Sequence, residues 1–290
     1  MKNLKFIFAV ILIATIISGC DYVYPTKQTT TNTVDTATYI RKVLIEDYTG
    51  HYCGNCPLAA IAIDTIISLY GSKIVPIAVH APITPGSWAD TVSYGPHYRT
   101  NFTTPTGDIW DATFAMSAGG NPCGGVDRIG GPNNFRTPYS TWALSAATEL
   151  ALPVAADIKI ANHYNTTTRV ITDTIICKYL QAVDSAYSLS VVVTEDSVID
   201  YQHFYLPSAH DDPNYVFNHI LRAPMNGTWG DTLSTGHQPA MATFTKIYSL
   251  DLNTVYQIKA GKEKHCHVVA FIFNTITKEV IQAEEVWATN

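Results

Sequence analysis

The sequence predicts an α/β domain over residues 40–150, followed by an all-β domain over residues 151–290. Up to about residue 150, apolar strand-like runs alternate with segments of helical spacing. From Pro153 onward the chain shows only short alternating runs, separated by turn residues such as those at 165–166. About 250 residues follow an N-terminal leader, which is enough for one large or two ordinary domains.

The leader, residues 1–19, is predicted to be a lipoprotein signal peptide. Lys2 and Lys5 form a basic start, and residues 6–17 are an apolar run that is short for a membrane span. The run ends in Ile-Ser-Gly before Cys20, a pattern typical of bacterial lipoproteins that are cut before an acylated cysteine. We therefore expect lipidation at Cys20. The alternative is an ordinary signal peptide or a short anchor helix.

Residues 20–39 are rich in threonine and have almost no apolar periodicity. This composition predicts a lipidated tether that joins the membrane to the folded domains. Export also places the chain in a compartment where disulfides persist. The expected location is the cell envelope.

The α/β domain begins with an apolar strand at residues 43–48. Residues 57–70 have helical spacing, with proline at the start and Gly71 as the stop signal. Residues 73–80 are a second apolar strand, and the connecting helix predicts that it runs parallel to the first.

The rest of this domain is less regular. Residues 81–113 are predicted to be an irregular insert of the kind that often forms a lid or rim. A turn at Asn121-Pro122 leads into a short strand, and Thr137 is a suitable N-cap for a helix that runs to about residue 150.

A Cys-x-x-Cys motif lies between the first strand and the first helix. This order places Cys53 at the helix N-terminus, where orphan N–H groups and the helix dipole favour a thiolate. Cys56 follows one turn later, within disulfide reach. The arrangement is typical of a thioredoxin-type redox centre. It predicts a thioredoxin-like α/β domain followed by an immunoglobulin-like β-sandwich.

Two acidic residues near the end of the first strand are candidates for a proton carrier. Asp47 lies six residues before Cys53, at the spacing of the buried carboxylate in thioredoxins. Glu46 is the alternative, because neighbouring strand residues face opposite sides of a sheet. A third interpretation is an exposed acid at the strand end.

Pro122 is predicted to be a cis-proline beside the Cys-x-x-Cys, where it would shape a substrate groove. Cys123 follows it directly. Cys123 is either a third thiol that resolves mixed disulfides or a small residue that faces the core of the sheet.

His51 and Tyr52 precede the motif, where thioredoxins usually carry a tryptophan. His51 either lowers the pKa of Cys53 or is a solvent-facing loop residue. Tyr52 stands in place of that tryptophan, and Gly-Asn lies between the cysteines. These residues do not determine the reduction potential of the pair or its substrate.

Two further cysteines fall in predicted strands of the second domain. Cys177 and Cys266 could form a disulfide between sheets, or both could be small buried residues. We expect no metal site, because His265 and His267 would face away from Cys266 on a strand. No cofactor motif is present, and a net charge of −6 argues against nucleic-acid binding.

Several motifs together resemble the Bacteroidetes outer-membrane lipoprotein family that is often labelled by an apparent mass of twenty-eight kilodaltons. They are the sequence around Cys20, residues 43–57, residues 121–128, and the C-terminal runs 215–223 and 268–286. The resemblance implies a thioredoxin-like domain plus a β-sandwich, anchored by lipid in the outer membrane. For the family, surface adhesion or receptor roles have been proposed, and no catalytic residues are established.

Two functions remain open from the sequence. In the first, the protein exchanges disulfides with exported protein thiols: Cys53 attacks, Cys56 resolves and Asp47 moves protons. In the second, it is a surface binding or adhesion lipoprotein in which the Cys53–Cys56 bond is a structural staple. Whether the protein is an enzyme therefore stays undecided at this stage.

Overall fold

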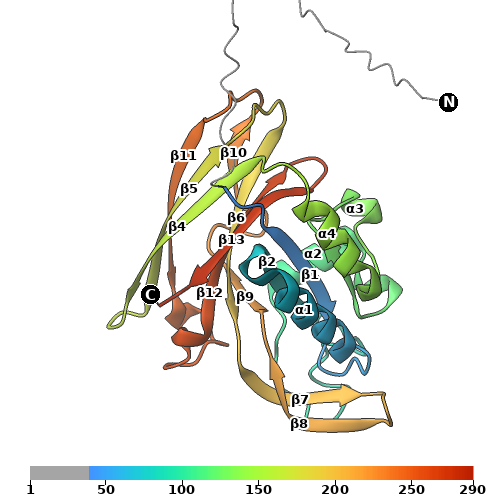
Figure 1. Ribbon diagram of the computed structural model, residues 1–290. Coiled ribbons are helices and arrows are strands. Elements are labelled where there is room, and N and C mark those ends of the chain that lie inside the picture. Colours follow the sequence, from blue (N-terminus) through green and yellow to red (C-terminus); the bar gives the residue numbers. More distant parts are fainter. Residues whose placement is uncertain (1–38, 290) are drawn as a thin grey trace, which may run out of the picture. The chain divides into compact units, whose positions relative to one another are not determined.

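The computed structural model describes residues 39–289. A mixed sheet of eight strands forms the centre of this part of the chain (Figure 1). In spatial order its strands are β13 (Val280–Trp287), β12 (Cys266–Asn274), β6 (Ala186–Glu195), β9 (Ile220–Pro224), β2 (Ile74–His80), β1 (Val43–Thr49) and β3 (Cys123–Val126), with β10 (Asp231–Thr235) paired to β6. The signal peptide, Cys20 and the tether up to residue 38 lie outside the described residues.

Two smaller sheets complete the β-structure of these residues. The first contains, in order, β11 (Thr243–Asp251), β5 (Val170–Tyr179) and β4 (Ala156–Asn165), and the second is the hairpin of β7 (Val198–Phe204) and β8 (His210–Phe217). The α-helices are α1 (Cys56–Tyr70), α2 (Pro105–Phe114), α3 (Gly131–Asn134) and α4 (Trp142–Leu150). Short 3₁₀ turns are η2 (Gly71–Lys73), η3 (Ser117–Gly119), η4 (Tyr139–Thr141), η5 (Leu252–Thr254) and η6 (Glu263–His265).

The predicted strand–helix–strand unit at the start of the domain is confirmed. β1 and β2 pair in parallel, from Val43 opposite Ile74 to Thr49 opposite His80, and α1 connects them. Pro57 lies in the first turn of α1, where its missing N–H has no intrahelical partner to lose. The helix ends at Gly71, whose φ of 58° favours glycine.

Both faces of β1 are buried, and its alternation sorts side chains between two cores. Val43 and Ile45 pack in a cluster that contains Ile63 of α1. Leu44 and Tyr48 pack on the other face in a separate cluster. This alternation decides which polar residues of β1 reach the candidate site.

Two helix starts differ from the sequence prediction. α2 begins at Pro105, inside the region predicted to be irregular, and the Thr104 side chain caps it by accepting a hydrogen bond from the Gly107 N–H. α4 begins only at Trp142, after a 3₁₀ turn, whereas Thr137 was predicted as the N-cap. Thr137 instead bonds to β3, through an N–H that donates to the Gly124 carbonyl.

Strands from both sides of the predicted domain boundary at residues 150 and 151 join the same sheet. β9 pairs with β2 at Ile220 opposite Ala78, and β6 pairs with β9 in turn. Residues 39–289 lie in a single compact unit. The boundary therefore marks a change of strand pattern, and the sheet continues across it.

The three-stranded sheet packs against the C-terminal part of the large sheet. Ile158 and Ile175 share a buried cluster with Val191 and Val268, so two β-layers enclose a second core. The sequence left open a disulfide between Cys177 and Cys266. The structure has no such bond: each of the two cysteines is a buried free thiol in this core. The Cys266 thiol donates to the Lys262 carbonyl, 3.8 Å away.

Candidate functional site

The Cys-x-x-Cys motif forms a disulfide in the loop between β1 and α1. The Cα atoms of Cys53 and Cys56 lie 5.3 Å apart, and the Cys56 N–H donates to the Cys53 carbonyl at 3.0 Å. Helix α1 begins at Cys56, with Asn55 as the N-cap. The sequence predicted Cys53 at the helix N-terminus. In the structure Cys53 lies in the turn before the helix, and Cys56 occupies the helix N-terminus.

The hairpin of β7 and β8 covers this disulfide. Both cysteines are only 3% exposed. The Gln202 side-chain amide donates to the Cys53 carbonyl at 3.0 Å, and the Tyr205 N–H donates to the Gly54 carbonyl at 3.0 Å. A Cβ atom on Gly54 would meet the Tyr205 ring at 2.5 Å, so the ring lies directly on the motif.

Aromatic stacking joins the hairpin to the insert that follows β2. The Tyr52 ring stacks on Tyr94 of the insert at 3.7 Å and on His203 of the hairpin at 4.7 Å between centroids. The His203 N–H donates to the His51 carbonyl at 2.9 Å. The insert and the hairpin therefore both contact the residues that precede the motif, and no local sequence signal had assigned the hairpin to the site.

His51 is buried, although the sequence left it as either a pKa-lowering group or a solvent-facing loop residue. Its Nε2 lies 3.1 Å from the Asp90 carbonyl, and its ring packs against Tyr98 and Phe102. Burial lowers the pKa of His51, so the ring is neutral near pH 7. A neutral ring supplies no positive charge to stabilise a Cys53 thiolate.

Asp47 is the acidic residue that faces the disulfide side of the sheet. It is buried, and burial raises the pKa of its carboxyl to about 8, so the carboxyl is protonated near pH 7. Its Oδ1 atom has no hydrogen-bond partner within residues 39–289. Glu46 points to the opposite face, where Arg128 binds it through two hydrogen bonds of 2.7 Å.

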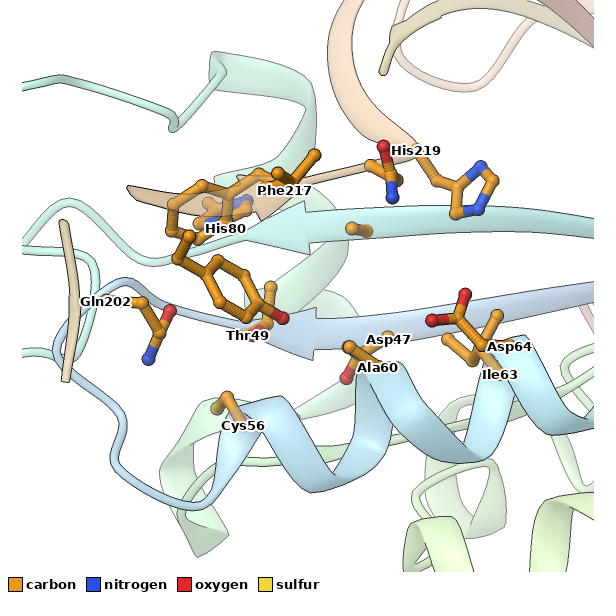
Figure 2. Close-up of a pocket in the computed structure, with 14 residues that line it drawn as sticks. Asp47, Thr49, Cys56, Ala60, Ile63, Asp64, His80, Gln202, Phe217 and His219 are labelled. Atoms are coloured by element: carbon orange, nitrogen blue, oxygen red, sulfur yellow. The ribbon is translucent and has the colours of Figure 1, made fainter. Parts of the chain in front are cut away.

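A cavity of about 60 Å³ connects Asp47 to Cys56 between β1, α1 and the hairpin (Figure 2). Its polar lining includes His80, Gln202 and His219. Neither ring nitrogen of His80 has a partner among the described residues, and burial holds the pKa of His80 well below its usual range. Since about 10–15 Å³ suffices for one water, the cavity has room for a short chain of waters beside the Asp47 carboxyl.

The structure bears on Pro122 through its peptide bond and on Cys123 through its burial. The Asn121–Pro122 bond is cis, as predicted. Cys123 lies opposite Tyr48 and shares its buried cluster, so its thiol points to the face of the sheet away from Asp47. Burial raises the pKa of Cys123 to about 12, and the thiol donates to the Met116 carbonyl. These observations favour the core-residue interpretation over a third reactive thiol.

Sequence reasoning identified Cys53, Cys56 and Asp47 but missed Gln202 and Tyr205. These two lie about 150 residues downstream of the motif, in or next to a strand whose sequence carries no signal that links it to the motif. His80 carried only a weak signal, as a polar residue at the end of a buried strand.

No helix within residues 39–289 combines the length and the apolar character that crossing a bilayer requires.

Comparison with known proteins gives one family and a number of solved structures. The family described as outer membrane protein Omp28 matches residues 111–289. HBP35 of Porphyromonas gingivalis is similar in structure, with 17% identity, a TM-score of 0.63, and coverage of 86% of this chain and 75% of its own. A domain of the outer membrane lipoprotein Omp28 from the same organism has 19% identity and a TM-score of 0.34, and covers 48% of this chain and 92% of its own. No curated protein matches the chain.

Proposed function

Because the chain belongs to the outer membrane protein Omp28 family, we propose that it is an envelope lipoprotein that exchanges disulfides with exported proteins. Family membership supports an envelope location, and the sequence before Cys20 supports a lipid anchor at that residue. We further propose that the fold combines a thioredoxin-like unit, built on β1, α1, β2 and β3, with an immunoglobulin-like sandwich. The similarity to HBP35 supports this fold and carries no information on activity.

The observation that carries the proposal is a protonated buried carboxyl beside a cysteine pair. In the oxidised form, a substrate thiolate attacks the Cys53 sulfur, forms a mixed disulfide and releases Cys56 as a thiolate. A second substrate thiol then gives up its proton, and its sulfur attacks the substrate sulfur of that mixed disulfide. This breaks the bond between Cys53 and the substrate and releases Cys53 as a thiolate, which takes up the proton. The products are a substrate disulfide and the reduced Cys53–Cys56 pair, so two electrons pass from the substrate to the protein.

Asp47 can supply the proton that the Cys56 thiolate needs. Its carboxyl is protonated near pH 7, and it lines the same cavity as Cys56 (Figure 2). A carboxyl with a pKa near the working pH can both give and take a proton. In the reverse direction, the same group accepts the proton when Cys56 attacks a mixed disulfide on Cys53.

The hairpin must move for a protein substrate to reach the disulfide. Three hydrogen bonds, the Tyr205 ring and the stack of His203 on Tyr52 hold it over the motif and the two residues before it. The two cysteines belong to neither of the large buried clusters, so the hairpin can open at the motif while those clusters stay packed.

The reduction potential of the pair tests the proposal. We expect a value above about −300 mV, because structural disulfides of secreted proteins lie below that value. Equilibration with dithiol buffers of defined potential, followed by alkylation and mass spectrometry, measures it. The Cys53→Ser/Cys56→Ser variant is the control and should show no thiol titration with the buffers and no turnover of a protein disulfide substrate.

A structural staple in a binding or adhesion lipoprotein is the second candidate. The burial of both cysteines favours it, because reactive pairs are usually partly exposed. A potential below about −300 mV together with no turnover would support the staple and contradict exchange.

Gly54→Ala is expected to speed reduction of the disulfide by a protein reductant, by about threefold or more. The new Cβ atom would meet the Tyr205 ring at 2.5 Å, so this half-exposed ring must shift and the hairpin loosens over the motif. The rate of thiol appearance measures the effect, and a threefold change corresponds to about 0.7 kcal/mol. Gly236→Ala is the matched control, because a Cβ atom there meets nothing within 4 Å. Equal rates for both variants and the parent protein would show that the hairpin does not limit access.

A further inference from the structure

A second, larger cavity lies beside the start of β7, and neither cysteine of the motif lines it. Its volume is about 470 Å³, within the range of about 300–1,000 Å³ that is usual for small-molecule sites. The end of β6, the start of β7, the strand β9, the insert near residue 100 and the loop 256–262 surround it. It shares none of its lining residues with the cavity beside Asp47.

Arg222 lines this cavity and has part of its hydrogen-bonding capacity unused. Its side chain is buried, and its Nε donates to the Glu195 carboxylate at 2.7 Å. Its Nη1 atom has no partner anywhere in the described chain. Five N–H donors on one guanidinium leave several for a ligand once a single carboxylate bond is made.

Arg128 is also buried, and its Nη1 atom likewise has no partner within residues 39–289, but its other contacts are more complete. Glu46 binds it through two hydrogen bonds, and five aromatic rings surround it at 4.6–5.8 Å. Arg222 has a single bond to its carboxylate and one aromatic ring, Phe102, at 5.6 Å. Unlike Arg128, it lines a cavity.

The cavity is also positively charged. Lys259 and Lys262, on the exposed loop, line it together with Arg222, whereas Glu195 is the one carboxylate in the lining. Three cationic groups against one anionic group leave an excess of two positive charges. The protein as a whole carries a net charge of −6, so this excess is local to the cavity.

We propose that this cavity binds a small organic anion, whose phosphate or carboxylate group is held by Arg222, Lys259 and Lys262. A guanidinium presents paired N–H donors that match both oxyanions, and the lysines add point charges at the mouth. The exposed ring of Tyr256 and the side chain of Val198 line the remaining volume and would contact the organic part of the ligand. This site is independent of thiol exchange.

Binding of inorganic phosphate and of succinate to the full chain tests the proposal. Isothermal titration calorimetry at low salt should show saturable binding of at least one of the two, and the stronger one identifies the preferred head group. Lys259→Gln/Lys262→Gln should weaken binding about tenfold or more, because charge-assisted hydrogen bonds are lost. Lys73→Gln/Lys159→Gln removes the same charge at exposed sites elsewhere and should leave the affinity within about twofold.

Absence of saturable binding for both anions would overturn the proposal, and so would equal weakening by the two double variants. A second measurement needs no variant. The bound anion should slow acetylation of Lys259 and Lys262 relative to Lys73, as read by mass spectrometry of the native protein. Unchanged relative acetylation in the presence of the anion that binds would place that anion elsewhere and contradict the assignment.

Discussion

Asp47→Asn is expected to raise the free energy of unfolding near pH 7 by about 4 kcal/mol, because one pKa unit corresponds to about 1.4 kcal/mol. The Asp47 carboxyl ionises near its ordinary pKa of 3.8 in the unfolded chain, but only at about 8 in the folded protein. Between these values the folded state holds a proton that the unfolded state has released. Stability therefore falls as the pH rises from about 4 to about 8, and the amide removes this loss.

Urea denaturation at several pH values measures the difference between the parent protein and the variant. The difference should be small near pH 4 and should reach its full size above about pH 8. Asp64→Asn is the control, because Asp64 lines the same cavity but is exposed. A pH-independent difference for Asp47→Asn would mean that the carboxyl is not held protonated by the fold. If Asp47 also serves exchange, the same variant should slow disulfide reduction near pH 7.

Arg128→Met is expected to lower the free energy of unfolding by about 3–5 kcal/mol, the usual cost of leaving a buried partner charge unpaired. Arg128 is fully buried. In the variant, the Glu46 carboxylate has no other salt-bridge partner within residues 39–289. The five aromatic rings around the guanidinium add to the loss, since they attract a cation and not a thioether.

Denaturation of Arg128→Met, Glu46→Gln and the double variant separates these contributions. The double variant should recover much of the stability that Arg128→Met loses, because no unpaired charge remains. Lys42→Met removes one partner of the partly exposed Lys42–Glu284 pair and should cost about 1 kcal/mol or less. An Arg128→Met variant as stable as Lys42→Met would show that the Glu46–Arg128 pair is not a structural requirement.

The choice between Asp47 and Glu46 shows where sequence reasoning stops. Strand alternation fixes that the two residues face opposite sides of β1, and this holds in the structure. Which side carries the disulfide depends on where α1 packs. Val43 and Ile45 pack against that helix, so Asp47, which is in phase with them, faces it too.

The cysteines of the second half show a similar limit. Apolar strand patterns indicate that Cys177 and Cys266 are buried, and both are. A pattern along one strand says nothing of the distance between two strands in different sheets. β5 belongs to the three-stranded sheet and β12 to the eight-stranded one, and each cysteine stays a free thiol.

The sequence by itself determined the local elements: the β1–α1–β2 unit, the disulfide at its turn, the cis-proline before β3 and the membership of the Omp28 family. These follow from contacts between residues close in the chain, or from motifs that are read directly. Only the tertiary structure decided that β9 joins β2, that the hairpin of β7 and β8 covers Cys53 and Cys56, and that Arg222 meets Lys262 at one cavity. Such placements depend on the register and packing of segments far apart in the chain, and a local pattern does not carry that information.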